Sequence, residues 1–321
     1  MSGGTMCRAR DARGHRRVGI VLAVAVAALL TGCSSGTPLA AGTGTGSTTP
    51  PSTAAPTTTT TTAPEEPGWT TLSVGPHGIA IDERTYPQLD GTQVIVTRFL
   101  HDHVNYSLHI GSQDPPTGGA VLGPQSGPAV SAAEAPLLLA CFNGGFKVAA
   151  HVGGTMSGGT TLVPLQSGLA SLVLDTAGRA QIGVWGSTVP TPGEQVASVR
   201  QNLPPLVLNG QPAANVADWQ AWGGTLGGIP RVARSALGED PSGNLLYAAT
   251  MAALPVDLAG ALISAGATTA MELDINPGTV HLETAATPGA PLVARIPGQN
   301  RPADQCQVGW IRDFVTVLSV G

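Results

Sequence analysis

The chain has 321 residues, of which 42% are hydrophobic and only 11% are charged. Beyond the arginine-rich first 17 residues it holds 10 basic against 19 acidic residues, so it lacks the basic surface that nucleic-acid binding requires. Its 43 glycines and 27 prolines favour turns and strands, and argue against long helices and coiled coils.

The first 32 residues have the plan of a secretory signal peptide, with a basic start and an apolar run at 18–30 that is too short to span a bilayer comfortably. The sequence Leu30-Thr31-Gly32-Cys33 resembles the bacterial lipobox, in which the cysteine is lipidated. An ordinary signal peptide with an incidental cysteine is the alternative. We predict lipidation at Cys33 and a lipid anchor on the outer face of the bacterial cytoplasmic membrane.

Residues 33–68 are predicted to be a disordered tether that follows the lipidated cysteine. This segment is rich in threonine and proline and includes six consecutive threonines at Thr57–Thr62. Little of it can be buried, so nothing would offset the entropy lost on ordering it. The tether would place the following domain in the cell wall or periplasmic space.

Residues 69–321 are long enough to form a single large domain with a sizeable core. Two hairpins are expected at the turn sequences Asp175–Gly178 and Asp240–Gly243, because strand-like runs flank both. These runs and the other expected strands cover residues 93–100, 107–110, 137–142, 169–174, 180–185, 232–239, 244–249, 269–275 and 314–320.

Short helices are expected at two places. Ser131 and Glu134 have the spacing of a capping box, which predicts a short helix that Pro136 ends. Pro255 suits the first position of a second helix, which Gly266 closes. Hairpins and short helices without a regular βαβ repeat predict an α+β fold with mixed or antiparallel sheets.

Two carboxylates in the strand expected at 269–275 form the clearest candidate site. Glu272 and Asp274 alternate with apolar residues, so their side chains share one face of the strand. Such a pair is either solvated or a site. Paired carboxylates at this separation are typical of glycoside hydrolases. One acts as acid or base, and the other acts as nucleophile or stabilises the oxocarbenium-like ion.

Two further segments carry polar groups at strand ends or in apolar strands. Arg234 could bind a phosphate or carboxylate through its fixed fork of donors, or form a structural salt bridge to one of the two acids. In Asn143-Gly144-Gly145-Phe146-Lys147 the glycines permit close approach of the backbone to a ligand, Asn143 could bind a sugar hydroxyl, and Lys147 supplies a point charge. An ordinary loop would also explain this segment.

The remaining candidates each have two interpretations. Cys141 and Cys306 are the pair left once Cys7 and Cys33 are set aside, and they could be bridged outside the cell, although Cys141 in an apolar strand could equally be a buried free thiol. His101-Asp102-His103 could bind a metal, but a solvated turn explains it better. We expect no metal and no cofactor.

In order along the chain, several of these segments resemble the phosphodiester glycosidase family, which includes the animal enzyme that uncovers mannose 6-phosphate; the chain looks like a secreted bacterial branch of it. The matching segments are Asn143–Phe146, Arg234–Gly238, the helix near 255–266, Glu272–Asp274 and Arg312–Val315. The chain departs from the family where Ile275-Asn276-Pro277-Gly278 replaces Gly-Gly-Gly-Ser.

The resemblance implies a surface lipoprotein that hydrolyses a sugar-1-phosphodiester bond in envelope glycans. Asp274 would stabilise or attack the anomeric carbon, and Glu272 would carry a proton or orient its neighbour. Arg234 and Lys147 would hold the phosphate, and Asn143, with Gly144 and Gly145, would bind the sugar. The alternative is a non-catalytic lipoprotein of the same fold that binds a glycan or phosphate, as the altered loop after Asp274 would suit.

Overall fold

The structure is a computed structural model that describes residues 68–321. The predicted signal peptide, the lipidation site Cys33 and nearly all of the tether lie outside the described residues. Within the described part, no helix has the length and apolar character needed to cross a membrane.

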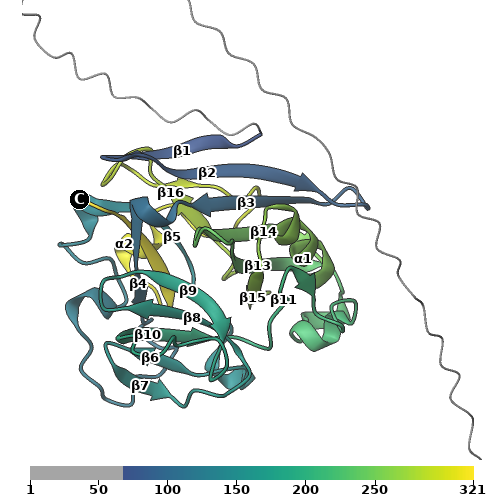
Figure 1. Ribbon diagram of the computed structural model, residues 1–321, viewed down its shortest axis with the longest axis horizontal. Coiled ribbons are helices and arrows are strands. Elements are labelled where there is room, and N and C mark those ends of the chain that lie inside the picture. The colour runs from purple at the N-terminus through teal and green to yellow at the C-terminus, as the bar shows by residue number, and fades with distance from the viewer. Residues whose placement is uncertain (1–67) are drawn as a thin grey trace, which may run out of the picture. The chain divides into compact units, whose positions relative to one another are not determined.

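The described residues form three sheets whose strands pair antiparallel (Figure 1). The largest sheet contains, in spatial order, β1 (Thr70–Gly75), β2 (Gly78–Pro87), β3 (Gln93–Phe99), β14 (Leu245–Ala253), β13 (Val232–Glu239), β15 (Thr269–Asp274), β11 (Val207–Leu208) and β12 (Gln211–Pro212). The second contains β7 (Thr160–Val163), β6 (Thr155–Ser157), β10 (Val196–Gln201), β8 (Ala170–Asp175) and β9 (Ala180–Val184). The third contains β17 (Val293–Ala294), β16 (Leu282–Thr284), β5 (Leu138–Asn143), β18 (Phe314–Ser319) and β4 (Val104–His109).

The helices are few and short. The α-helices are α1 (Pro255–Ser264) and α2 (Gln305–Val308). The 3₁₀ turns are η1 (His101–His103), η2 (Pro124–Ser126), η3 (Ala135–Leu137), η4 (Val148–Ala150), η5 (Trp219–Trp222) and η6 (Leu226–Gly228). Antiparallel sheets with a few short helices in one domain confirm the predicted α+β fold class.

The central strands of the large sheet are apolar without interruption because both of their faces are covered. In β14, Leu245 and Tyr247 pack into the main core with β5, β18 and the second sheet, whereas Leu246 and Ala248 face the other way. That second face is covered by α1, which lies beside β13 and β14 (Figure 1). Burial on both faces replaces the alternating pattern of a half-exposed strand with a continuous apolar run.

Local sequence signals fixed α1 and both hairpins where they were expected. Pro255 occupies the first turn of α1, the Asp257 carboxylate accepts from Leu254 N at 2.8 Å, and Gly266 follows the helix with a φ of +102°. The turn before β14 closes through Gly243 N and Asp240 O at 3.0 Å. These contacts satisfy backbone groups within a few residues, which is why sequence alone reveals them.

The helix expected at Ser131–Glu134 is not formed. The reciprocal contacts of a capping box are present, with Ser131 N donating to Glu134 Oε2 at 3.0 Å and Glu134 N donating to Ser131 Oγ at 3.3 Å. Pro136 follows too closely for an α-helix to continue, so the segment is a turn followed by η3. The Glu134 side chain instead reaches His109 Nε2 at 3.1 Å in the core.

Candidate functional site

A cleft of about 560 Å³ lies beside the end of β15, and we call it the Asp274 cleft. Its walls come from five parts of the chain: the segment after β5, the residue Leu203 after β10, the segment around η5, the end of β15 with the two residues after it, and Arg312 shortly before β18. The lining residues are Phe146, Lys147, Ala150, Val152, Leu203, Gln220, Ala221, Gly223, Gly224, Asp274, Ile275, Asn276 and Arg312. The cleft therefore brings together Asp274 and Lys147 of the predicted site residues.

Asp274 is almost fully buried at this cleft, with 4% of its surface exposed. Its Oδ1 atom accepts hydrogen bonds from Ile275 N at 2.7 Å and Asn276 N at 3.1 Å, and Oδ2 lies 3.3 Å from Arg312 Nη2. Burial raises the pKa of Asp274 to about 6, against the opposing effect of the Arg312 charge. The carboxyl group can therefore change its proton occupancy near neutral pH.

Arg312 is a functional candidate to which sequence reasoning gave no role. Its guanidinium lies between Asp274 and Asp114, with Nε 3.1 Å from Asp114 Oδ2, and it also donates to the Gly145 carbonyl oxygen. It appeared in the sequence only as part of the segment resembling a closing strand. Its two acidic partners are 38 and 198 positions away, so no local pattern signals the contact.

The segment Asn143–Lys147 is bonded to neighbouring segments, and its last two residues line the cleft. Gly144 N donates to Asp313 O at 3.0 Å, and Phe146 N donates to Asn202 Oδ1 at 3.0 Å. A Cβ atom at Gly144 would collide with the Asp313 carboxylate, and one at Gly145 with the Asn202 amide. The glycines thus permit close approach, as expected, but to protein groups.

Asn143 is fully buried behind the cleft rather than in it. Its Nδ2 donates to Ser235 Oγ at 3.0 Å, and its Oδ1 accepts from Tyr247 Oη at 2.8 Å. The amide is thereby committed to joining β5, β13 and β14. The expectation that Asn143 binds a sugar hydroxyl is corrected on this point, because both ends of its side chain are used within the core. Lys147, in contrast, is exposed at the cleft.

Arg234 forms the structural ion pair that the sequence left open, and its partner is Glu272. Arg234 Nη1 lies 2.6 Å from Glu272 Oε1 and 2.9 Å from Trp222 O, and Nε donates to Ala253 O at 3.1 Å. Both side chains are buried, and neither lines the Asp274 cleft. Arg234 Nη2 has no hydrogen-bond partner among the described residues, but the guanidinium is enclosed in the core and away from the cleft lining, so the expectation that it holds a phosphate there is corrected.

Glu272 and Asp274 share a face of β15, as their spacing predicted. Met271 and Leu273 pack into the main core, which leaves the two carboxylates on the opposite side. Burial raises the pKa of Glu272 to about 8, although the Arg234 charge acts to lower it. Glu272 thus holds its proton at higher pH than Asp274 does, but it lies behind the cleft.

The structure also shows the cysteine pair and the His101–His103 segment. Cys141 and Cys306 form a disulfide, so the bridged alternative is the one observed. His101 and His103 lie in η1, where His103 Nδ1 is 2.5 Å from Ile79 O. Among the described residues, metal-ligating side chains gather elsewhere, at Cys141, His281, Glu283 and Cys306.

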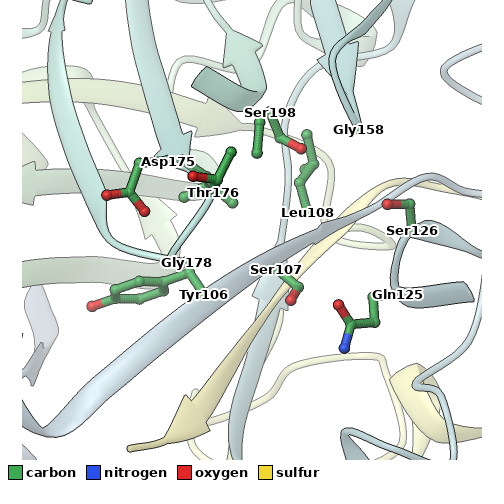
Figure 2. Close-up of a pocket in the computed structure, with 12 residues that line it drawn as sticks. Tyr106, Ser107, Leu108, Gln125, Ser126, Gly158, Asp175, Thr176, Gly178 and Ser198 are labelled. Carbon is green, nitrogen blue, oxygen red and sulfur yellow. The ribbon is translucent and has the colours of Figure 1, made fainter. Parts of the chain in front are cut away.

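A second hollow, of about 200 Å³, lies between β4 and the second sheet, and Figure 2 shows its lining. The lining is mostly neutral and polar, including Ser107, Gln125 and Ser198. Its carboxylate, Asp175, accepts from Ala177 N and Arg179 N at 2.8 Å within the hairpin turn. Because that carboxylate stabilises the turn, the Asp274 cleft is the stronger candidate for chemistry.

Comparison with solved structures finds 14 similar chains, three of which are as follows. The catalytic domain of zebrafish N-acetylglucosamine-1-phosphodiester alpha-N-acetylglucosaminidase, auto-inhibited by its pro-peptide, is 14% identical over 79% of this chain and 88% of its own, with a TM-score of 0.48. A hypothetical protein from Synechocystis is 13% identical over 76% and 63%, with a TM-score of 0.43. A Burkholderia pseudomallei protein whose name describes it as exported is 16% identical over 75% and 75%, with a TM-score of 0.37. At these TM-scores the likenesses say nothing about activity.

No protein-family model matches the chain. No curated protein matches it either.

Proposed function

We propose that the chain is a glycosidase that hydrolyses a sugar-1-phosphodiester bond in an envelope glycan. The observation that carries this proposal is the buried Asp274 carboxyl group, with its raised pKa, at a cleft that Lys147 also lines. The order of motifs that resembles the phosphodiester glycosidase family supports the same reaction class. A carboxylate for the sugar and a cation for the phosphate are the two charges that this bond requires.

In the proposed reaction, the bond between the anomeric carbon and the phosphate oxygen breaks, and its electrons leave with the phosphate. The ionised Asp274 stabilises or attacks the electron-poor anomeric carbon. A water molecule then bonds to that carbon, displaces Asp274 where it has attacked, and releases one proton to the departed phosphate or to solvent. A phosphate leaves readily, so the site needs no strong acid beside the leaving group. Lys147 holds the phosphate, and Arg312 positions Asp274.

Glu272 contributes from behind the cleft. It does not line the cleft, and the nearby Asp274 charge adds to the burial that raises the pKa of Glu272. Through its ion pair with Arg234 it also fixes β15 against β13. We therefore assign Glu272 the orienting role of the two that the sequence left open.

The test offers the full chain UDP-GlcNAc and isolated wall polymer, and measures released sugar. We expect release by the wild type and collapse of turnover with retained binding in Asp274→Asn, which keeps the shape and removes the charge. Lys147→Gln should weaken binding by about 1.5–3 kcal/mol, the usual worth of a charge-assisted contact. Turnover by the wild type should rise with pH through about 6, as Asp274 ionises.

The same assay distinguishes the proposed enzyme from a non-catalytic binding protein. One observation favours this second candidate function. Ile275 replaces the glycine that the family pattern places after Asp274, and Oδ1 of Asp274 is occupied by the amides of Ile275 and Asn276. Saturable binding of wall polymer without sugar release would favour this alternative. A well-folded Asp274→Asn variant with undiminished turnover would remove Asp274 from the mechanism.

We further propose that the protein is a lipoprotein anchored at Cys33 to the outer face of the cytoplasmic membrane. The lipobox-like sequence and the threonine-rich segment after it support this location. Mass spectrometry of the mature N-terminus should find a lipidated Cys33, and Cys33→Ala should stay unprocessed. A mature N-terminus at another residue would end this proposal.

A further inference from the structure

Four potential metal ligands meet in the core, and none of them lines the Asp274 cleft. They are Cys141 in β5, His281 just before β16, Glu283 in β16 and Cys306 in α2. All four are fully buried, and one ligand atom from each lies within 4.8 Å of all the others. We call these residues the Cys-His-Glu cluster.

The disulfide between Cys141 and Cys306 accounts for only half of this cluster. Glu283 Oε2 lies 2.8 Å from His281 Nδ1 and 3.9 Å from Cys306 Sγ. His281 Nε2 is also buried, and among the described residues it has no hydrogen-bond partner. Burying an imidazole and a carboxylate against sulfur costs free energy, and a disulfide requires neither of them.

Neighbouring groups hold the cluster in a fixed arrangement. Gln299 Nε2 donates to Glu283 Oε1 at 2.8 Å, and the Trp310 ring lies edge-on to His281 at 4.7 Å between centroids. Metal ligands are oriented in the same way, by outer hydrogen bonds and packing that fix the ring and the carboxylate. The arrangement therefore resembles a prepared ligand set more than a chance contact.

We propose that, when the disulfide is reduced, the Cys-His-Glu cluster binds one Zn²⁺ ion through two thiolates, one imidazole nitrogen and one carboxylate oxygen. Reduction by a dithiol delivers two electrons and two protons to the sulfurs, and the dithiol becomes a disulfide. Metal binding then displaces the two thiol protons to solvent. This site is a departure from the sequence-based expectation of no metal.

The geometry and the ligand types suit zinc. Ligand atoms around a tetrahedral Zn²⁺ stand roughly 3.3–3.8 Å apart, given metal–ligand bonds of about 2.0–2.3 Å. The 4.8 Å limit of the cluster encloses such a set once the sulfurs separate. Two soft thiolates with one imidazole select zinc over magnesium or calcium, and four protein ligands make a closed, structural site.

Either state of the cluster would tie together two of the chain segments that line the cleft. Cys141 precedes the Asn143–Lys147 segment by two residues, and Cys306 precedes Arg312 by six. The disulfide joins these segments under oxidising conditions, and Zn²⁺ would join them under reducing ones. The cleft would thus keep its shape when the disulfide is lost.

The test uses the full chain, reduced by dithiothreitol without oxygen, freed of reductant and titrated with Co²⁺ as a spectroscopic substitute. We expect one equivalent to bind, with a thiolate-to-cobalt absorption band and the visible bands of a tetrahedral ion, both lost when Zn²⁺ is added. Glu283→Gln and His281→Gln should each weaken Co²⁺ binding by about tenfold or more. Oxidised wild type should show no thiolate band.

Controls separate this site from other cysteines and from misfolding. Cys7→Ser and Cys33→Ser should leave the Co²⁺ spectrum and stoichiometry unchanged. Circular dichroism of the oxidised Glu283→Gln and His281→Gln variants, in which the disulfide remains, shows whether each is folded before reduction. The proposal is overturned if reduced wild type binds no Co²⁺, or if the folded variants bind it as tightly as wild type does.

Discussion

Removing Arg234 should destabilise the protein, because its guanidinium is enclosed in the core. Arg234→Ala deletes a donor group that lies 2.6 Å from Glu272 and also serves the Trp222 and Ala253 carbonyl oxygens. Above pH 8, where Glu272 is ionised, it is left without its counter-charge, and breaking a buried ion pair from one side costs about 3–5 kcal/mol. We expect the free energy of unfolding to fall by that amount. This is a large share of the roughly 5–15 kcal/mol that stabilises an ordinary domain.

The assay is urea unfolding followed by tryptophan fluorescence, beside a UDP-GlcNAc titration of each folded variant. Arg179→Ala is the matched control, because Arg179 is exposed and its loss should change stability by less than about 0.5 kcal/mol. Glu272→Gln, which strands Arg234 instead, should also be destabilised. If Arg234→Ala is as stable as the control and binds UDP-GlcNAc more weakly, the ion-pair interpretation is wrong and Arg234 is a phosphate ligand.

Three further predictions concern the pH dependence of stability, the close packing at Gly144 and the Cys141–Cys306 disulfide. The pKa of Glu272 is raised from 4.5 to about 8, so the folded state binds this proton more tightly than the unfolded state does. The proton's contribution to the free energy of unfolding is therefore full below pH 4.5 and is lost as pH rises through 8. Urea unfolding of wild type between pH 4.5 and 8 should show this loss, and Glu272→Gln should not. Gly144→Ala should lower the melting temperature by several degrees through a steric clash, whereas Gly127→Ala, at a position with open space, should not. Replacing Cys141 and Cys306 together with serine should cost about 2–5 kcal/mol in urea unfolding, and an unchanged midpoint would show that the bridge is dispensable.

The parts of the fold that sequence predicted well are those whose signals are local. The hairpin of β13 and β14 follows from a turn whose hydrogen bonds close within five residues, and α1 follows from a proline at its start and a glycine at its end. The strand β5 was found as a continuous apolar run. In each case the residues that decide the structure are neighbours in the chain.

The capping box at Ser131 shows how such a signal can mislead. The expected hydrogen bonds form, but the Glu134 carboxylate has a second partner in His109, and Pro136 prevents further helical turns. Which sheet each strand joins was also beyond the sequence, because β3 pairs with β14 although about 145 residues separate them, a spacing that no local pattern encodes.

The sequence indicated some of the residues that line the cleft, but not the contacts that the candidate residues make. The sequence placed Asp274 and Lys147 among the candidate site residues, and both line the cleft. It could not choose a partner for Arg234, since that choice depends on a register in which Ala236 lies opposite Glu272 and Ser235 opposite Asp274, with an irregularity between them. Arg312 had no local signal at all, because its contacts join three distant segments.

The two carboxylates of β15 have different surroundings although only two positions separate them along the strand. Glu272 lies within the sheet, where a fully enclosed arginine is its counter-charge and burial raises its pKa to about 8. Asp274 is the last residue of β15, so its backbone turns away, two amides reach Oδ1, and its pKa is raised only to about 6. Two acids that alternate with apolar residues in the same strand thus become one carboxyl group buried in the core and one that lines the cleft. Only the second lines the cleft. We therefore expect Arg234→Ala to lower stability and Asp274→Asn to lower turnover.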